Sequence, residues 1–164
     1  METEDLKELL IKCWMTHDGM WFYHCLKECG MMKTNKINRA AIKSLANVEI
    51  KRIKRAFNIK KIDTFNDLKF LFNNALKTFK ADFMEFSFNF PSTNHLHCKL
   101  QKCWAYDGIK KIGAIDQYEC GIFDRIEGWF ESLGIKYEAE PVIEGCLMHT
   151  IGQCFRDYHF FFDK

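Results

Sequence analysis

The chain has 164 residues, a net charge of +2 and 16 phenylalanines in a 48% hydrophobic composition. This length allows a substantial core, and the aromatic content predicts a thick core or an apolar ligand pocket. No apolar run approaches the roughly 20 residues of a membrane span, and the acidic start METEDLKELL lacks the layout of a signal peptide. We therefore expect one cytoplasmic domain over residues 1–164 and no membrane partner.

The first 80 residues predict helices. Apolar residues recur at three- and four-residue steps over residues 3–28, and Gly30 supplies a stop. A second helix is expected over residues 32–57. A third begins near Thr64, where Thr64 and Asp67 resemble a capping box.

The second predicted helix is strongly basic. Residues 31–61 hold ten Lys/Arg and a single acid, Glu49. A solvated helix face explains this charge, and an anionic partner for this helix is the alternative. Nucleic acid is disfavoured because no aromatic residues interleave with the charges.

Residues 81–164 predict a small antiparallel sheet with helices between the strands. Alternating apolar and polar residues indicate strands over 82–90 and 95–104 around a turn, and further strands over 135–143 and 153–162. A short helix is expected over 105–113. Asp116 is expected to cap the next helix, which contains Tyr118–Leu133. The fold class is therefore α+β, with N-terminal helices packed on the sheet and a helix–strand–strand C-terminus.

Two glycines lie on one face of that helix. Gly121 and Gly128 are seven residues apart, which predicts the close approach of another backbone. Gly19, in the middle of the first helix, similarly suggests a close neighbour or a ligand.

The cysteines suggest a metal or thiolate site. Eight cysteines without an export signal point to a reducing compartment, where cysteines serve as free thiols, metal ligands or catalytic groups. Cys120 opens a helix, whose N-terminus is expected to lower the pKa of the thiol. Cys146 and Cys154 flank a turn that contains His149, and Cys103 is a further partner. We predict a zinc or iron site at these four cysteines. Structural free cysteines are the alternative, since the spacing matches no zinc finger.

The stretch WMTHDGMWF predicts a pocket wall. Trp14, Trp21 and Trp129 are the candidate ligand-binding residues, and His17 or Asp18 is the candidate catalytic base. The alternative for His17 is a buried histidine bonded to a carbonyl. His95 and His97 can chelate a metal by spacing, but exposed histidines beside a turn explain them better.

Two resemblances extend these expectations. The C-terminal sequences CGIFDRIEGWFESLG and GCLMHTIGQCFRDYHF resemble the bacterial 4-vinyl reductase-type domain, whose fold is shared with transport-particle subunits and haem–nitric oxide-binding domains. This resemblance implies a small-molecule or metal site at Cys120, Cys146 and Cys154. WMTHDGMWF, INRAAIKSLANVEIKRI and CWAYDGIKKIG resemble uncharacterised proteins grouped with L-2-amino-thiazoline-4-carboxylic acid hydrolases, which implies hydrolytic ring opening.

The leading functional hypothesis is a small-molecule-binding domain with a cysteine-rich metal or thiolate site. The first alternative is a metal-assisted hydrolase of a small heterocycle, in which a metal-bound water attacks a C=N carbon. The second is a dimeric interaction module built through the long basic helix.

Overall fold

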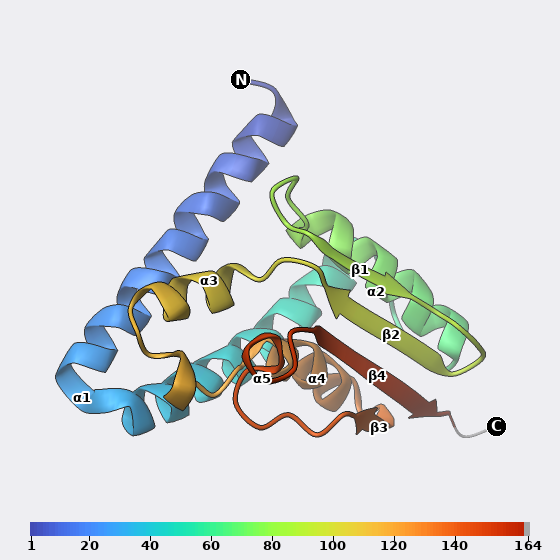
Figure 1. The fold of residues 1–164 in the computed structure, drawn as a ribbon. Coiled ribbons are helices and arrows are strands. Elements are labelled where there is room, and N and C mark those ends of the chain that lie inside the picture. The colour runs from blue at the N-terminus through green and yellow to red at the C-terminus, as the bar shows by residue number, and fades with distance from the viewer. Residues whose placement is uncertain (163–164) are drawn as a thin grey trace.

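The structure is a computed structural model and describes residues 1–162 (Figure 1). Its helices and strands confirm the α+β class. They are α1 (Thr3–Ala56), α2 (Phe65–Phe79), β1 (Phe86–Asn89), β2 (His95–Leu100), α3 (Trp104–Lys111), the 3-10 helix η1 (Ile115–Gln117), α4 (Ile122–Leu133), β3 (Lys136–Glu140), α5 (Leu147–Thr150) and β4 (Cys154–Phe161). No helix of residues 1–162 is long and apolar enough to cross a membrane.

Helix α1 is two helices joined at a sharp bend. Gly30 interrupts it with a φ of 73° and a ψ of 167°, a conformation that glycine adopts without steric cost. The part before Gly30 projects from the body as an arm, and the part after it turns back beneath the sheet (Figure 1). The predicted stop at Gly30 and the two predicted helices are thereby confirmed. We call residues 3–29 the arm.

Helix α2 begins at the predicted capping box. The Thr64 side chain accepts a hydrogen bond from the Asp67 backbone N–H, and the Asp67 carboxylate accepts one from the Thr64 N–H. These two contacts satisfy backbone donors that the first turn of a helix leaves free.

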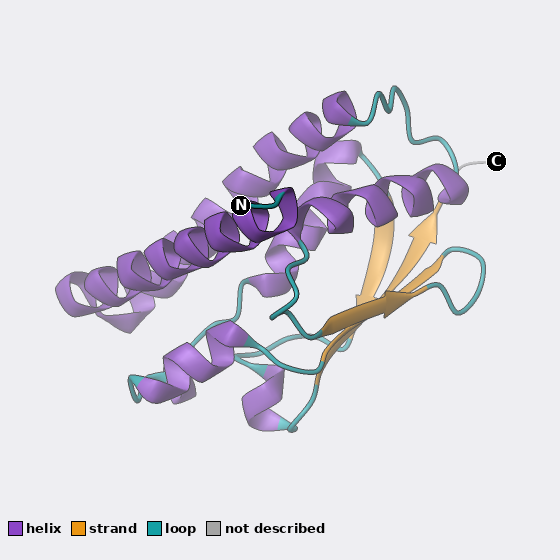
Figure 2. Ribbon diagram, turned by 90° about the horizontal axis from the view of Figure 1, so that it is seen from above, coloured by secondary structure: helices purple, strands orange, loops and turns teal. Residues whose placement is uncertain are grey.

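The four strands form one antiparallel sheet in the order β1-β2-β4-β3. In β4, Tyr158 lies opposite Leu96 of β2 and Ala139 of β3. Helices α1, α2 and α4 lie on one side of the sheet (Figure 2). Because side chains alternate along a strand, one face of the sheet packs on these helices and the other carries polar residues.

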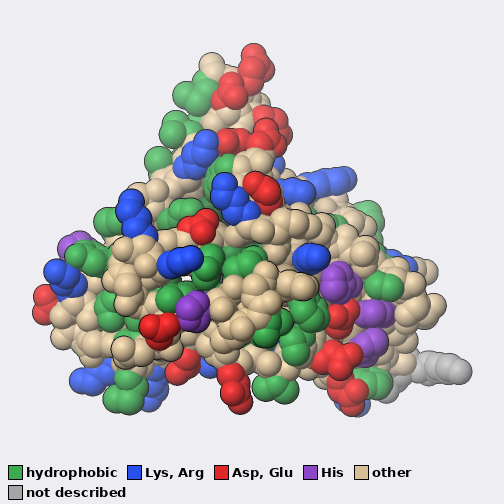
Figure 3. Space-filling model, in the orientation of Figure 1, with side chains coloured by type: hydrophobic (Ala, Val, Ile, Leu, Met, Phe, Trp, Pro, Cys, Tyr) green, Lys and Arg blue, Asp and Glu red, His purple; other side chains and the backbone are tan. Residues whose placement is uncertain are grey.

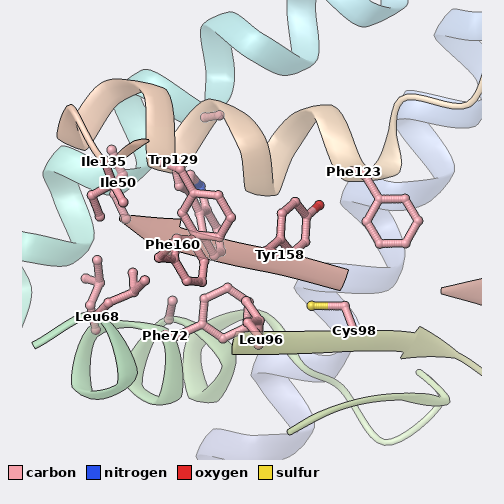
Figure 4. Close-up of a cluster of buried hydrophobic side chains, with 14 of the residues drawn as sticks. Ile50, Leu68, Phe72, Leu96, Cys98, Phe123, Trp129, Ile135, Tyr158 and Phe160 are labelled. Atoms are coloured by element: carbon pink, nitrogen blue, oxygen red, sulfur yellow. The ribbon is translucent and has the colours of Figure 1, made fainter. Parts of the chain in front are cut away.

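The core fills the space between that face and the helices. Tyr158 and Phe160 of β4 lie among Phe72 of α2, Leu96 of β2 and Trp129 of α4 (Figure 4). Aromatic pairs at edge-to-face angles recur there, which is the geometry that aromatic quadrupoles favour. The expected thick aromatic core is present.

Gly121, the N-cap of α4, and Gly128 within α4 allow this helix to pack closely on the second half of α1. A Cβ at Gly121 would lie 2.6 Å from Ile42 Cδ1, and one at Gly128 would lie 2.7 Å from Ala46 Cβ. The predicted close approach is confirmed, with the second half of α1 as the neighbour. Gly19 plays the same part in the arm, where a Cβ would meet Trp104 at 2.8 Å.

Two local predictions were wrong. Asp116 lies in η1 and does not cap α4, whose N-cap is Gly121. Its carboxylate instead lies 2.9 Å from His149 Nε2. The connection between Cys146 and Cys154 is not a simple turn, because the short helix α5 occupies it.

Candidate functional site

The fold brings the four predicted cysteines together from four separate segments. Cys103 is the N-cap of α3, Cys120 precedes α4, Cys146 precedes α5 and Cys154 begins β4. The Cys120 N–H donates to the carbonyl of Gly145 at 3.2 Å, which fixes the segments of Cys120 and Cys146 side by side. We call these four residues the thiol cluster.

The thiols of Cys103, Cys120 and Cys154 are held in the protonated form. Burial raises the pKa of Cys120 and of Cys154 to about 12, and the neighbouring cysteines of the cluster add to the rise. Burial also raises the pKa of Cys103. The expectation that the helix N-terminus lowers the pKa of Cys120 was wrong. Cys120 lies just before the helix, and the backbone contact at Ile122 is outweighed by the loss of water.

The cluster does not have the geometry of a metal centre. Within residues 1–162, no group of three or more His, Cys, Asp or Glu side chains is placed to hold a metal ion. Zinc needs about four donors at roughly 2.0–2.3 Å in a tetrahedron. The residues as arranged therefore do not fit zinc or iron, although their chemistry suits both.

Cys120 lines a pocket of about 420 Å³. The pocket lies between the second half of α1, α4, β4 and the segment from Val142 to Gly145. Its polar lining carries both charges. Its lining residues are Arg39, Glu119, Cys120, Phe123, Asp124, Glu127, Val142, Ile143, Glu144, Gly145 and Arg156.

Both arginines of the pocket are held by carboxylates. Arg39 binds the buried Asp124 through Nε at 2.7 Å and Nη2 at 3.1 Å, and its Nη1 lies 3.3 Å from Glu119. The hydrogen bonds that Arg39 donates to Asp124 raise the pKa of Arg39 further above its ordinary value. Arg156 lies 2.9 Å from Glu127. Burial raises the pKa of Glu127, and the nearby Arg156 opposes the rise.

The structure places the other predicted site residues elsewhere. His17, Asp18 and Trp21 are exposed on the arm, and none of them lines the pocket beside Cys120. Trp129 is buried in the core and donates its indole N–H to Glu49 at 2.9 Å. Trp14 is half-buried and covers the guanidinium of Arg125 at 5.1 Å. The aromatic pocket expected from these tryptophans is therefore not assembled.

Sequence reasoning missed Arg39, Asp124 and Arg156. Arg39 and Asp124 are 85 residues apart, and Arg39 belongs to the basic stretch of residues 31–61, whose charge a solvated helix face explains. Asp124 offered a usable signal, because a carboxylate near a helix start within an apolar stripe needs a cationic partner when it is buried.

A labelling experiment tests the protonated state of Cys120. The thiolate is the form that reacts. At pH 8, N-ethylmaleimide is therefore expected to react with Cys120 roughly 100-fold more slowly than it reacts with the free thiol of glutathione. The rate is expected to rise through pH 10 without levelling, as a pKa of about 12 requires. Mass spectrometry of the Cys120 peptide measures it. A rate that levels off near pH 7 would contradict the burial of this thiol.

The polar face of the sheet holds a second group of titratable residues, seen in purple on the right of Figure 3. Asp157 Oδ1 lies 2.7 Å from His95 Nε2 and 2.9 Å from His97 Nδ1. The ring of His159 stacks on that of His95 at 4.4 Å. His95 and His97 are half-buried rather than simply exposed, whereas His159 is exposed.

Replacing Asp157 with asparagine is expected to lower the free energy of unfolding by about 1–2 kcal/mol at pH 7. Burial raises the pKa of Asp157, but the hydrogen bonds from His95 and His97 outweigh it and lower the pKa overall. A lowered folded-state pKa gives stability above the unfolded value of about 3.9, which is lost as the pH falls further. Urea titrations from pH 7 to pH 3 should show the two proteins converging in acid. Glu138→Gln, on the same sheet, is the control.

Comparison with known protein families gives one match. Residues 2–132 match a family of unknown function (DUF6125). The matched range includes Cys103, Cys120 and Arg39, whereas Cys146, Cys154 and Arg156 follow it. No curated protein and no solved structure shows a significant match to the chain.

Proposed function

We propose that this protein, which belongs to the DUF6125 family of unknown function, is a small-molecule-binding domain. The observation that carries this proposal is the pocket of about 420 Å³ that has the Cys120 thiol and two arginines in its wall. Pockets of about 300–1,000 Å³ with a few convergent polar groups are typical of small-molecule sites.

The charges of the pocket favour a ligand that carries both a carboxylate and a cationic group. Arg39 reaches Glu119 only with Nη1 and at 3.3 Å, and both side chains are about half exposed. A ligand carboxylate can replace Glu119 there without disturbing the buried bond between Arg39 and Asp124. Glu144 and the displaced Glu119 then provide carboxylates for an ammonium or amidinium group. Small amino acids and their cyclic derivatives have this chemistry.

Cys120 contributes a neutral thiol to such a site. A protonated sulfur packs against apolar parts of a ligand and donates a weak hydrogen bond, and it does not attack an electrophile. The thiol cluster thus shapes and desolvates one wall of the pocket. The arginines of the pocket donate the hydrogen bonds to a ligand carboxylate.

Thermal unfolding with a panel of probes tests the proposal. The panel contains the twenty amino acids and L-2-amino-thiazoline-4-carboxylate. A probe present at 100 times its Kd stabilises the folded state by about 2.7 kcal/mol, which raises the Tm by roughly 5–10 °C. Cys120→Ser should reduce the shift, whereas Cys13→Ser, on the arm, should leave it unchanged. Failure of every probe to shift the wild-type Tm, or an equal shift in Cys120→Ser, would contradict the proposal.

The metal-assisted hydrolase is distinguished in the same samples. Elemental analysis of protein purified without chelators, together with turnover of L-2-amino-thiazoline-4-carboxylate, separates the two functions. A stoichiometric metal and turnover lost in His17→Ala would replace the binding proposal by the hydrolase. A probe that binds to metal-free protein and is not turned over would support the binding proposal.

A further inference from the structure

The arm presents a long exposed stripe that no part of the described chain covers. Its eight residues lie within about 120° of the helix circumference, because they recur at three- and four-residue steps. Five of them, all large and apolar, are 45–63% exposed. The stripe consists of Leu6, Leu9, Leu10, Cys13, His17, Met20, Trp21 and His24, all exposed. Hydrophobic side chains follow the outer edge of the arm in Figure 3.

The opposite side of the arm is held by the body. Ile11 and Phe22 are buried, and Phe22 contacts the ring of Tyr118 with centroids 5.7 Å apart. Trp104 of α3 packs against Gly19. The stripe is therefore presented outward by a fixed helix. A contiguous apolar surface of this kind marks an interaction site.

We propose that this stripe pairs with the same stripe of a second copy of the chain, in an antiparallel twofold dimer. From Leu6 to His24 the stripe runs about 27 Å at 1.5 Å per residue. It is self-complementary in the antiparallel direction, because its spacing from either end is the same. The pairs across the axis are Leu6 with His24, Leu9 with Trp21, Leu10 with Met20, and Cys13 with His17.

Charge at the edges of the stripe fits this direction. Glu2 and Asp5 lie at one end of the arm, and Lys27 lies on the same edge at the other end. In an antiparallel pair, equal edges of the two helices adjoin, so Lys27 of one copy lies beside Glu2 and Asp5 of the second. In a parallel pair the unlike edges would adjoin and the two helices would start at the same end, so Glu2 and Asp5 of one copy would not meet Lys27 of the second.

The same charges argue against a membrane as the occupant of the stripe. Helices that lie on anionic membranes carry lysine and arginine on the flanks of their apolar face. Residues 1–20 contain five acids and two lysines. Anionic lipid would therefore repel the arm, whereas a second arm offers both apolar surface and opposite charge.

The molar mass in solution tests the proposal. Light scattering across 1–200 µM should give about twice 19.5 kDa for the wild type at high concentration. The double variant Leu10→Glu/Trp21→Glu should give 19.5 kDa with unchanged circular dichroism. Phe70→Glu, an equally exposed apolar position on α2, is the matched control and should remain dimeric. A wild-type monomer at 200 µM, or a dimer unaffected by the double variant, would overturn the proposal.

Cross-linking tests the register. Cys13 of each copy lies near the twofold axis, so a short bismaleimide should join two chains through this residue. Cys13→Ser should abolish the covalent dimer, and Cys29→Ser, at the far end of the arm, should not. Cross-links that persist in Cys13→Ser would contradict the antiparallel register. Sedimentation with anionic vesicles that is lost in the double variant would assign the stripe to a membrane and overturn the dimer.

Discussion

Replacing Glu49 with alanine is expected to lower the free energy of unfolding by about 3–5 kcal/mol. Glu49 is buried between α1 and α4, where Oε2 accepts from Arg125 Nε at 2.8 Å and from Trp129 Nε1 at 2.9 Å. The guanidinium of Arg125 lies 4.6 Å from the ring centroid of Phe79 and is shielded from water on that side. Without the carboxylate, a partly buried cation and an indole N–H lose their acceptor. Urea unfolding measures the loss.

Glu131→Ala is the matched control for Glu49. Glu131 of α4 also joins α4 to α1, through Lys43, but its side chain is 51% exposed and its carboxylate lies 3.6 Å from the Lys43 ammonium. An exposed ion pair of this kind contributes at most about 1 kcal/mol. If the two variants lose the same small amount of stability, then Glu49 does not anchor the two helices.

Gly128→Ala is expected to lower the free energy of unfolding by about 1–2 kcal/mol. A Cβ at Gly128 would lie 2.7 Å from Ala46 Cβ, so α1 and α4 must move apart. Overpacking of this kind costs about 1–3 kcal/mol, and the better helix propensity of alanine offsets part of it. The packed interface also forms one side of the pocket, so the change should reach the region of Arg39 and Asp124.

Gly108→Ala is the control, and it is expected to change the free energy of unfolding in the opposite direction. Gly108 lies within α3, and a Cβ there would meet no atom within 4 Å. This substitution is expected to raise the free energy of unfolding by about 0.4–1 kcal/mol. Equal effects of the two substitutions in a urea titration would show that the approach of α1 to α4 is not close at Gly128.

Local chemistry made much of the fold predictable. Three features depend on residues near one another in the chain, so the sequence pattern predicts them. They are the bend at Gly30, the capping box at Thr64 and the glycine face of α4. Asp116 misled because a carboxylate before an apolar helix predicts a cap, whereas here it lies in η1 beside His149.

Only part of the site could be predicted from the sequence, for a similar reason. The sequence indicated that Cys120, Cys146 and Cys154 meet, because strand and helix order determine where they lie. Their pKa values depend on burial by residues distant in sequence, which spacing does not reveal. The helical spacing of Trp129 fits a pocket wall and a core residue equally well. Its buried hydrogen bond to Glu49, 80 residues away in the chain, places it in the core.

Protection of Cys120 by a bound molecule tests the central claim most directly. N-ethylmaleimide labelling is followed by mass spectrometry at pH 9, with and without each probe of the panel. We predict that at least one probe carrying both a carboxylate and a cationic group slows the labelling of Cys120 and leaves that of Cys13 unchanged. Equal labelling of Cys120 with and without every probe would contradict a small-molecule site at this pocket.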